Sequence, residues 1–349
     1  MDTRIVSRFA LACLLIVTGL LAQTGLRQAA AQDDPLRVVF VVNGVLGDKS
    51  FFDSAAEGMN RMEAELGVEA DILEAGYDRA RWEPALAEAA DSDYDIIIVG
   101  TFDMNGYLTE IAPEYPDTRF IIFDDVVDYS TGCCDNVYSI QYGTSDAAYL
   151  AGYAAAMVSE TGVLGTILGA EGGPVLEFAV GFEQGAEAAN PDVEVLQAVV
   201  GGANPYSDPA KGKELALAQI QQGADVIFPI AGSSGIGSLQ AARDESVLAI
   251  GVDSDQAALF AETDPAQAEV IFTSVLKNVG QSLFLAVEGT IDGTTEYGTA
   301  VTLGLAEGAV DIVQDENYNE VVPEEVRTTI DELREQIANG EIEVEGAIN

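Results

Sequence analysis

The sequence predicts an α/β protein with two similar lobes, each built on a parallel β-sheet. Short apolar strands alternate with helical segments from residue 36 onward, and the alternation restarts about midway along the chain. In the stretch 223–256, an apolar strand, a Gly/Ser-rich turn at 232–237, a helical segment and a second strand follow one another. This order is the βαβ unit of a parallel sheet, and such sheets bind ligands beyond the carboxyl ends of their strands. Because Gly232 and Asp253 come at such ends, we expect this stretch to form one wall of a small-molecule site.

The first run of alternating elements is typical of a sheet covered on both faces, with right-handed crossovers between its strands. A Gly-containing loop and a helix, whose start is signalled by Ser50 and Asp53, follow the first strand. The expected strands lie at 36–43, 68–74, 94–100, 118–125 and 136–143, and two further helices lie at 81–92 and 105–116.

The second run begins with a helix at 145–160 whose small residues suit close packing. The segment 299–313 is interpreted as one or two strands, and 322–342 as an amphipathic terminal helix with Pro323 at its start. The other strands are expected at 163–170, 193–202, 224–231, 247–252 and 270–278, and the other helices at 177–190, 209–223 and 279–293. Two such runs favour two lobes, and the cleft between them is the default binding site.

The first 31 residues differ from the rest of the chain. Arg4 and Arg8 precede an apolar run at 9–21, and alanines follow at 29–31. This is the pattern of a cleaved secretory signal peptide, since the apolar run is short for a membrane span. We therefore expect a mature chain that works in the periplasm or outside the cell. Its length suits two domains, and 48% hydrophobic residues are ample for two cores.

The charge of the chain restricts its partners. The formal net charge is −44, and removing the +2 of the first 31 residues leaves −46. So strong a negative field repels nucleic acids and anionic membranes and disfavours anionic ligands. Acids spread through folded segments are typical of a surface adapted to high salt, which screens self-repulsion.

The chain contains no histidine, which excludes Ser-His-Asp and Cys-His catalysis and histidine-based metal sites. Cys133 and Cys134 are adjacent, so they are interpreted as loop residues or as a vicinal disulfide, and not as metal ligands. The loop at 232–237 lacks the Lys-Ser/Thr ending of a nucleotide-binding P-loop. We therefore expect no catalytic residues, no metal and no cofactor.

Six motifs occur in a specific order: GDKSFFDSAAEG, YLAGYAAA, DPAKGKELALAQIQQGADVI, AGSSGIG, GVDSDQ and TSVLKNV. The series resembles the basic membrane protein family, the purine nucleoside receptor-like substrate-binding proteins of ABC transporters, from residue 36 to about 342. The resemblance implies a type I periplasmic-binding-protein fold, in which two Rossmann-like lobes are joined by a three-segment hinge. It implies a monomer that delivers a nucleoside to an ABC permease. We expect lobe I at 36–140 plus about 275–298, and lobe II at 141–274 plus about 299–349.

The resemblance also implies roles for residues that match the motifs. Phe51 resembles the aromatic residue that stacks on a purine, and Tyr206 stands where the family commonly has a Phe for the other face. Asp253 and Lys277 resemble the pair that holds the ribose hydroxyls, and Gly232 would offer backbone groups.

The remaining candidates are less specific. Asp103 and Asn105 fall in the loop where the family places a polar residue for the base edge, and Asn43 replaces an acid at the end of the first strand. Asp48, in the GDKSF motif, and Phe178 complete the expected ligand-binding set.

Each candidate has a structural alternative. Phe51 and Phe178 could be core residues, Tyr206 an exposed loop aromatic, and Lys277 a member of a surface ion pair. The ligand could be a sugar or another hydroxylated small molecule, and the protein could be a sensor subunit. A nucleoside hydrolase is disfavoured, because no compact Asp cluster follows the first strand.

Overall fold

Two six-stranded sheets organise residues 35–347, the part of the chain that this computed structural model describes. The strand orders are β11-β5-β4-β3-β1-β2 and β12-β10-β9-β8-β6-β7. Neighbouring strands are parallel throughout, except that β12 runs antiparallel to β10. The two parallel-sheet lobes expected from the sequence are confirmed. The expected signal peptide at 1–31 lies outside the described residues.

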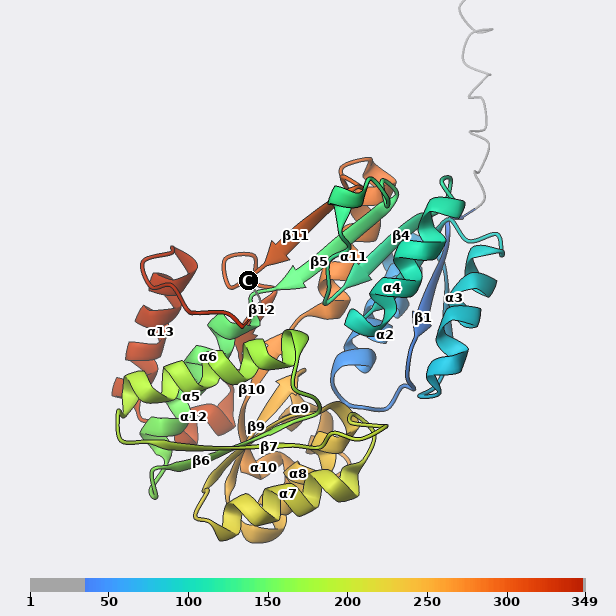
Figure 1. The fold of residues 1–349 in the computed structure, drawn as a ribbon. Coiled ribbons are helices and arrows are strands. Elements are labelled where there is room, and N and C mark those ends of the chain that lie inside the picture. Colours follow the sequence, from blue (N-terminus) through green and yellow to red (C-terminus); the bar gives the residue numbers. More distant parts are fainter. Residues whose placement is uncertain (1–34, 348–349) are drawn as a thin grey trace, which may run out of the picture. The chain divides into compact units, whose positions relative to one another are not determined.

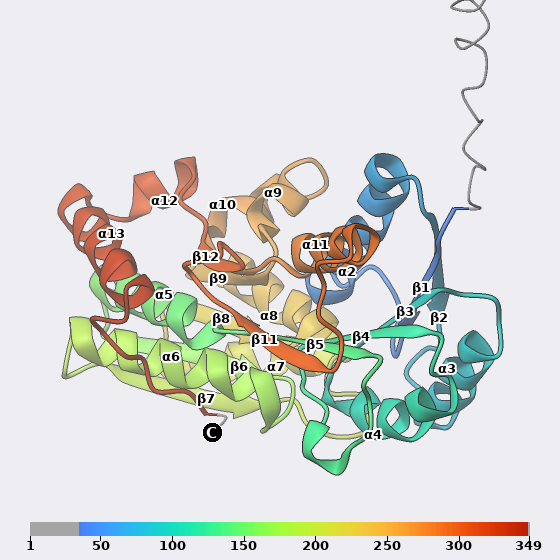
Figure 2. The ribbon, with the colours of Figure 1, turned by 90° about the horizontal axis from the view of Figure 1, so that it is seen from above.

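The first sheet is buried between two layers of helices (Figures 1 and 2). Alternate residues of its strands serve opposite faces, so Phe40 packs with α2 and α11, whereas Val41 packs with α3 and α4. Its strands are β1 (Arg37–Val42), β2 (Glu69–Glu74), β3 (Ile96–Gly100), β4 (Arg119–Phe123), β5 (Val137–Tyr142) and β11 (Thr299–Leu303). Its helices are α2 (Phe51–Arg61), α3 (Trp82–Ala90), α4 (Phe102–Ile111) and α11 (Val279–Asp292).

The second sheet has the same layered construction. In Figure 1, α5 and α6 lie above it and α7 and α8 below it. Its strands are β6 (Val163–Leu168), β7 (Glu194–Val199), β8 (Val226–Ile230), β9 (Leu248–Asp253), β10 (Ile271–Lys277) and β12 (Val310–Ile312). One face carries α5 (Thr144–Val158), α6 (Gly173–Ala189), α12 (Glu316–Val321) and α13 (Glu324–Ala338). The other carries α7 (Pro209–Gln221), α8 (Gly232–Glu245), α9 (Gln256–Ala261) and α10 (Pro265–Val270).

The described chain passes between the two sheets three times: from β5 to α5, from β10 to α11 and from β11 to β12. These are the three crossing segments that the family resemblance implies. The segment 299–313 forms two strands in different sheets. The expected boundary near 298 assigns 299–303 to lobe II, but this strand pairs with β5 and so belongs to the first sheet.

The prediction of a turn at 232–237 is wrong, because α8 begins at Gly232. The small residues serve helix packing: a Cβ at Gly237 would lie 1.8 Å from the carbonyl oxygen of Pro209 on α7. The expected helices at 105–116 and 177–190 begin earlier, at Phe102 and Gly173. The short helices α9, α10 and α12 were not predicted.

The adjacent cysteines Cys133 and Cys134 form a vicinal disulfide in the loop between β4 and β5, one of the two interpretations left open by the sequence. Among the described residues, the helices are too short or too polar to cross a membrane.

Helices α5 and α6 approach closely because both present glycines at their contact. A Cβ at Gly152 would lie 2.0 Å from the carbonyl oxygen of Phe182, and one at Gly185 would lie 1.9 Å from that of Tyr149. Real Cβ atoms do not approach backbone oxygens so closely, so this packing requires glycine. The close packing predicted from the small residues of 145–160 is confirmed.

We expect Gly185→Ala to lower the free energy of unfolding by about 1–3 kcal/mol, because the added methyl group overpacks the contact between α5 and α6. The matched control is Gly106→Ala in α4, where a Cβ would meet nothing within 4 Å. This change should raise stability by about 0.4–1 kcal/mol. Chemical denaturation in molar salt measures both variants. Equal effects of the two changes would contradict the packing argument.

Candidate ligand-binding site

A cavity lies between the two sheets, beyond the carboxyl ends of their strands, and the empty space in it and in the open solvent at its mouth is about 980 Å³. Both lobes line it, as expected for a site at the carboxyl edge of parallel sheets. The structure brings all nine residues of the expected ligand-binding set to this cavity: Asn43, Asp48, Phe51, Asp103, Phe178, Tyr206, Gly232, Asp253 and Lys277.

The centre of the site is a buried cluster of one ammonium and two carboxylates. Lys277 Nζ, at the end of β10, lies 3.0 Å from Asp124 Oδ1 and 3.6 Å from Asp253 Oδ1. Asp124 follows β4 in the first sheet, so its bond to Lys277 joins the two lobes. The Lys277 side chain is 3% exposed. It is a buried ion-pair partner and not the surface residue of the alternative interpretation.

The backbone is strained around this cluster. Asp124 and Asp253 both adopt positive φ angles, of 67° and 62°, and Thr101, at the end of β3, has a φ of 73°. Non-glycine residues rarely adopt this conformation, and it persists at sites where the surrounding structure holds it. Positive φ angles thus occur at three strand ends that line the cavity, two in the first sheet and one in the second.

The charge state of the cluster follows from its burial. Burial alone would lower the pKa of Lys277, but the carboxylates of Asp124 and Asp253 outweigh it and raise this pKa. Burial raises the pKa of Asp124, and the ammonium of Lys277 opposes that shift. Lys277 is therefore charged, and it faces two carboxyl groups.

Aromatic rings surround the ammonium. Lys277 Nζ lies 4.7 Å from the ring centroid of Phe51 and 5.1 Å from that of Phe178. Phe51 also packs against Phe123, with ring centroids 5.1 Å apart. Phe178 is 2% exposed and belongs to the hydrophobic core, yet it lines the cavity. The core and ligand-facing interpretations of Phe178 are thus compatible.

Three buried polar atoms of the cavity wall lack a hydrogen-bond partner within the described residues: Asn43 Oδ1, the hydroxyl of Tyr206 and Asp253 Oδ1. The amide nitrogen of Asn43 donates to Thr101 Oγ1 at 2.9 Å. Burial raises the pKa of Tyr206, so its hydroxyl is protonated and can donate. Buried polar atoms are normally paired, so these atoms mark positions where a ligand can supply the partner.

Asp48 lines the cavity, but its oxygens are occupied. They accept hydrogen bonds from the backbone N–H groups of Ser50, Phe52 and Asp53. Burial raises the pKa of Asp48 to about 6, although these three donors oppose the shift. Asp48 thus binds the free N–H groups at the start of α2. The sequence predicts the start of this helix from Ser50 and Asp53, and the helix begins at Phe51.

Other candidates also have local partners. Asp103 Oδ1 pairs with Arg79 at 2.9 Å at the rim of the cavity. Asn105 turns away, because its amide donates to Asp125 Oδ2 and to the carbonyl of Val126. The prediction that Asn105 faces the ligand is therefore not supported by the geometry.

Sequence reasoning missed several residues of the site. Asp124 ends the strand IIFDD just as Asp253 ends AIGVD, so the rule applied to one strand end would have found both. Tyr77, Arg79 and Trp82 line the cavity from a loop and a helix start that carry no motif. No group of three His, Cys, Asp or Glu side chains within residues 35–347 is arranged to hold a metal ion.

We expect Lys277→Met to lower the free energy of unfolding by about 3–5 kcal/mol at pH 7, because it leaves two buried carboxylates without a counter-charge. Without the ammonium, the pKa of Asp124 rises further above its unfolded value. A raised pKa contributes stability that is lost as pH rises, so the deficit relative to wild type should be small near pH 4 and full at pH 7.

Denaturation of both proteins at each pH measures this deficit. Lys213→Met is the control, because Lys213 pairs with Asp244 at the surface and should cost less than about 1 kcal/mol. A deficit that grows as the pH falls would contradict the proposed charge state.

Comparison with known proteins places this cavity in a family. Residues 36–347 match the family model described as "ABC transporter substrate-binding protein PnrA-like". Basic membrane protein A of Borreliella afzelii is 30% identical over 310 residues, which cover 88% of this chain and 90% of that protein. The CD4+ T-cell-stimulating antigen of Listeria innocua is 28% identical over 314 residues, 86% of this chain and 85% of that protein.

Solved structures confirm the fold. An ABC transporter solute-binding protein from Aeropyrum pernix K1 superposes with a TM-score of 0.80 and 25% identity, covering 90% of this chain and 94% of that chain. A solute-binding protein from Conexibacter woesei gives a TM-score of 0.71 at 23% identity, covering 89% and 99%. The expected type I periplasmic-binding-protein fold is confirmed, and the chain belongs to the family of PnrA-like substrate-binding proteins of ABC transporters.

Proposed function

We propose that this protein binds a nucleoside, and in particular a purine nucleoside, in the cavity between its lobes and delivers it to an ABC permease. The observation that carries the proposal is the buried cluster of Asp124, Asp253 and Lys277 beside aromatic rings. A nucleoside combines a flat apolar base with vicinal hydroxyls, and this wall offers partners for both parts.

The sugar end of the ligand belongs at the cluster. Asp253 Oδ1 is buried and without a hydrogen-bond partner among the described residues, so it is free to accept a hydroxyl proton. The Lys277 ammonium can donate to the hydroxyl oxygens. Charge-assisted hydrogen bonds of this kind are about twice as strong as neutral ones.

The base belongs near Phe51 and Tyr206. Stacking of a base on an aromatic side chain contributes roughly 1–3 kcal/mol. Asn43 and Tyr206 line the same cavity, where Asn43 Oδ1 can accept a hydrogen bond and the Tyr206 hydroxyl can donate one. These two atoms would read the polar edge of the base.

The ligand should be neutral. The cluster holds two carboxyl groups against one ammonium, and the chain as a whole is strongly acidic, with 59 Asp and Glu residues against 15 Lys and Arg. Nucleotide phosphates would enter this field at an electrostatic cost. The cavity is thus suited to nucleosides over nucleotides.

Delivery completes the proposed role. Members of this family serve ABC transporters, whose substrate-binding proteins meet their permeases outside the cytoplasm. We propose that this chain is periplasmic or extracellular, monomeric and without enzymatic activity. The closed, liganded form would be recognised by the permease, because ligand binding shifts the lobes toward closure.

A sugar or another hydroxylated small molecule is the second candidate, since a carboxylate pair and an ammonium suit any polyol. A thermal-shift panel of nucleosides, free bases, nucleotides and pentoses in molar salt separates the two. Ligand at about 100 times its Kd should stabilise the protein by roughly 2.7 kcal/mol. A response to adenosine, guanosine or inosine alone supports the proposal, whereas a response to pentoses alone rejects it. Recovery of intact nucleoside after incubation excludes hydrolysis.

We expect Asp253→Asn to weaken the binding of ribonucleosides about 10- to 100-fold, because it removes a charged hydrogen-bond acceptor. The affinity for 2′,3′-dideoxynucleosides should change much less. The chain's single tryptophan, Trp82, lines the cavity, so fluorescence titration measures both affinities. Asp192→Asn, in the exposed loop after α6, controls for the change in net charge. Equal losses for both ligand types would contradict the role of Asp253.

Phe51→Leu should keep most of the apolar volume and lose the flat ring. We expect nucleoside affinity to fall by about 1–3 kcal/mol, the contribution of one stacking contact. Calorimetric titration measures this change, and the unfolding midpoint of the variant checks its packing against Phe123. Nucleoside affinity within about twofold of wild type would refute stacking on Phe51.

A further inference from the structure

On one side of the cavity, two loops from different lobes are bonded directly to each other. Residues 48–50 precede α2 in the first lobe, and residues 253–260 follow β9 in the second. Gln256 Nε2 donates to the carbonyl of Lys49 at 3.0 Å, and Ser254 Oγ donates to the carbonyl of Ser50 at 3.2 Å. Lys49 Nζ donates to the carbonyl of Leu259 at 3.2 Å.

The central bond of this junction involves the ligand-facing carboxylate. Ser50 Oγ donates to Asp253 Oδ2 at 2.6 Å, and Ser50 is fully buried. The two carboxyl oxygens of Asp253 thus have different surroundings. Oδ2 is held by Ser50 of the other lobe, whereas Oδ1 lies 3.6 Å from Lys277 Nζ and has no hydrogen-bond partner among the described residues. Ser50 therefore fixes the rotation of the carboxylate that leaves Oδ1 toward the cavity.

Both sides of the junction are held rigidly. In the first lobe, Asp48 fixes the backbone N–H groups of Ser50, Phe52 and Asp53. In the second lobe, Gln256 is 1% exposed, and its Oε1 accepts from the backbone N–H of Val252 at 3.1 Å. Its Nε2 is thereby aimed at Lys49.

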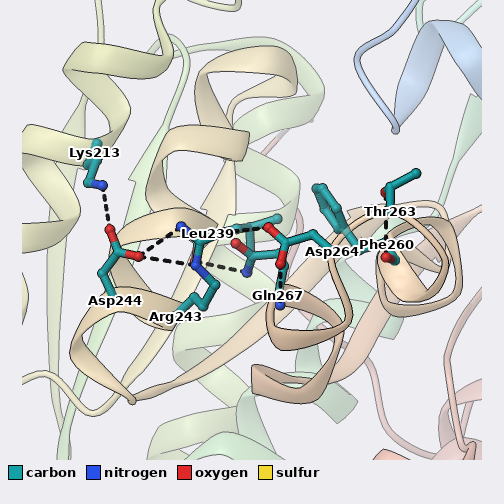
Figure 3. Close-up of polar contacts among 8 residues, drawn as sticks. All are labelled: Lys213, Leu239, Arg243, Asp244, Phe260, Thr263, Asp264 and Gln267. Atoms are coloured by element: carbon teal, nitrogen blue, oxygen red, sulfur yellow. Dashed lines mark hydrogen bonds and ion pairs between the residues drawn. The ribbon is translucent and has the colours of Figure 1, made fainter.

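A network behind α9 supports the second side (Figure 3). Arg243 on α8 pairs with Asp264 at the start of α10, and Gln267 Nε2 donates to the carbonyl of Leu239. Thr263 Oγ1 lies within 3.5 Å of the carbonyl of Phe260, at the end of α9. Helix α10 is thus tied to α8, and α9, which carries Leu259 and Phe260, is joined to α10 by the short loop that contains Thr263.

The backbone at two residues of the junction adopts an uncommon conformation. Lys49 has a φ of 52° and Asp253 a φ of 62°. Such conformations in non-glycine residues persist where contacts over-determine them. Part of the contacts at these two residues comes from the opposite lobe, because Gln256 bonds the carbonyl of Lys49 and Ser50 bonds Asp253.

We propose that Lys49, Ser50, Asp253, Ser254, Gln256 and Leu259 form an interlobe clasp, a set of direct bonds that hold the two lobes together, with Ser50 as the positioning residue for Asp253. Closure makes the Ser50–Asp253 bond, and this bond presents Oδ1 to the ligand hydroxyls. The clasp couples the position of the lobes to the affinity of the site. The positioning of Asp253 for ligand hydroxyls rests on the proposed function, whereas the bonding of the two lobes by the clasp does not.

The ligand-free arm of the test measures the clasp. Small-angle scattering in molar salt should give a larger radius of gyration for Ser50→Ala and for Ser254→Ala than for wild type, because each change removes a bond between the lobes. Ser54→Ala is the matched control, since Ser54 lies on α2 and bonds to the N–H of Gly280, away from the clasp. Circular dichroism checks that each variant is folded. Equal radii for wild type and both clasp variants would overturn the clasp.

The ligand arm measures positioning, through the ratio of the affinities for a ribonucleoside and its 2′,3′-dideoxy analogue. Ser50→Ala should reduce this ratio about 10-fold, because the freed carboxylate no longer holds the hydroxyls. Ser254→Ala weakens the clasp but keeps the Ser50 hydroxyl, so the Ser50–Asp253 bond forms again when the lobes close on a ligand. The ratio should therefore stay within about twofold of wild type. Trp82 fluorescence gives all four affinities.

The two arms separate the possible failures. An unchanged ratio in Ser50→Ala, with a wild type that discriminates the two ligands, overturns the positioning role and leaves the proposed function intact. A wild type that binds no nucleoside rejects the proposed function, and the scattering result then decides the clasp. If Ser50→Ala fails to fold, Ser254→Ala alone decides the clasp, and Ser50→Thr, which keeps the hydroxyl, should preserve the ratio.

Discussion

The site depends on one buried ammonium group, that of Lys277, which forms ion pairs with two carboxyl groups. Lys277 ends β10 in the second sheet, and its ammonium reaches Asp124 of the first sheet and Asp253 of its own. A carboxylate buried without a counter-charge is costly, so neither acid could occupy its strand end without the lysine. The lysine in turn remains charged because two carboxylates face it. The bond between Lys277 and Asp124 also joins the lobes beside the crossing from β10 to α11.

The polar groups around this cluster are of two kinds: some have hydrogen-bond partners within residues 35–347, and others have a buried atom without one there. Asp48 has both oxygens occupied by backbone donors, and Asn105 is bound to the loop after β4. Asn43, Tyr206 and Asp253 each keep one buried atom without a partner among the described residues. The distinction separates residues that build the wall from residues that are available to a ligand.

The sequence predicted the two layered lobes because strands buried on both faces are continuously apolar, and helices between them follow from that pattern. Helix starts were harder to predict. The Gly/Ser run at 232–237 has the composition of a turn, yet it is the first part of α8, because α7 lies too close for larger side chains. That constraint comes from a neighbouring helix, so the residues 232–237 by themselves do not reveal it. Asp124 was missed for a related reason: its partner Lys277 is 153 positions away, whereas Asp253 belonged to a recognisable motif.

The pairing of β11 with β5 has a consequence for how the protein is made. Residues 299–303 complete the edge of a sheet whose other strands all lie before residue 143. During synthesis, β5 therefore keeps an unpaired edge while most of the second lobe, from α5 to β10, emerges from the ribosome. Unpaired edges are templates for aggregation, and a contact between distant segments forms slowly. The many acidic residues repel other copies of such an incomplete chain, and this repulsion disfavours aggregation until β11 completes the first sheet.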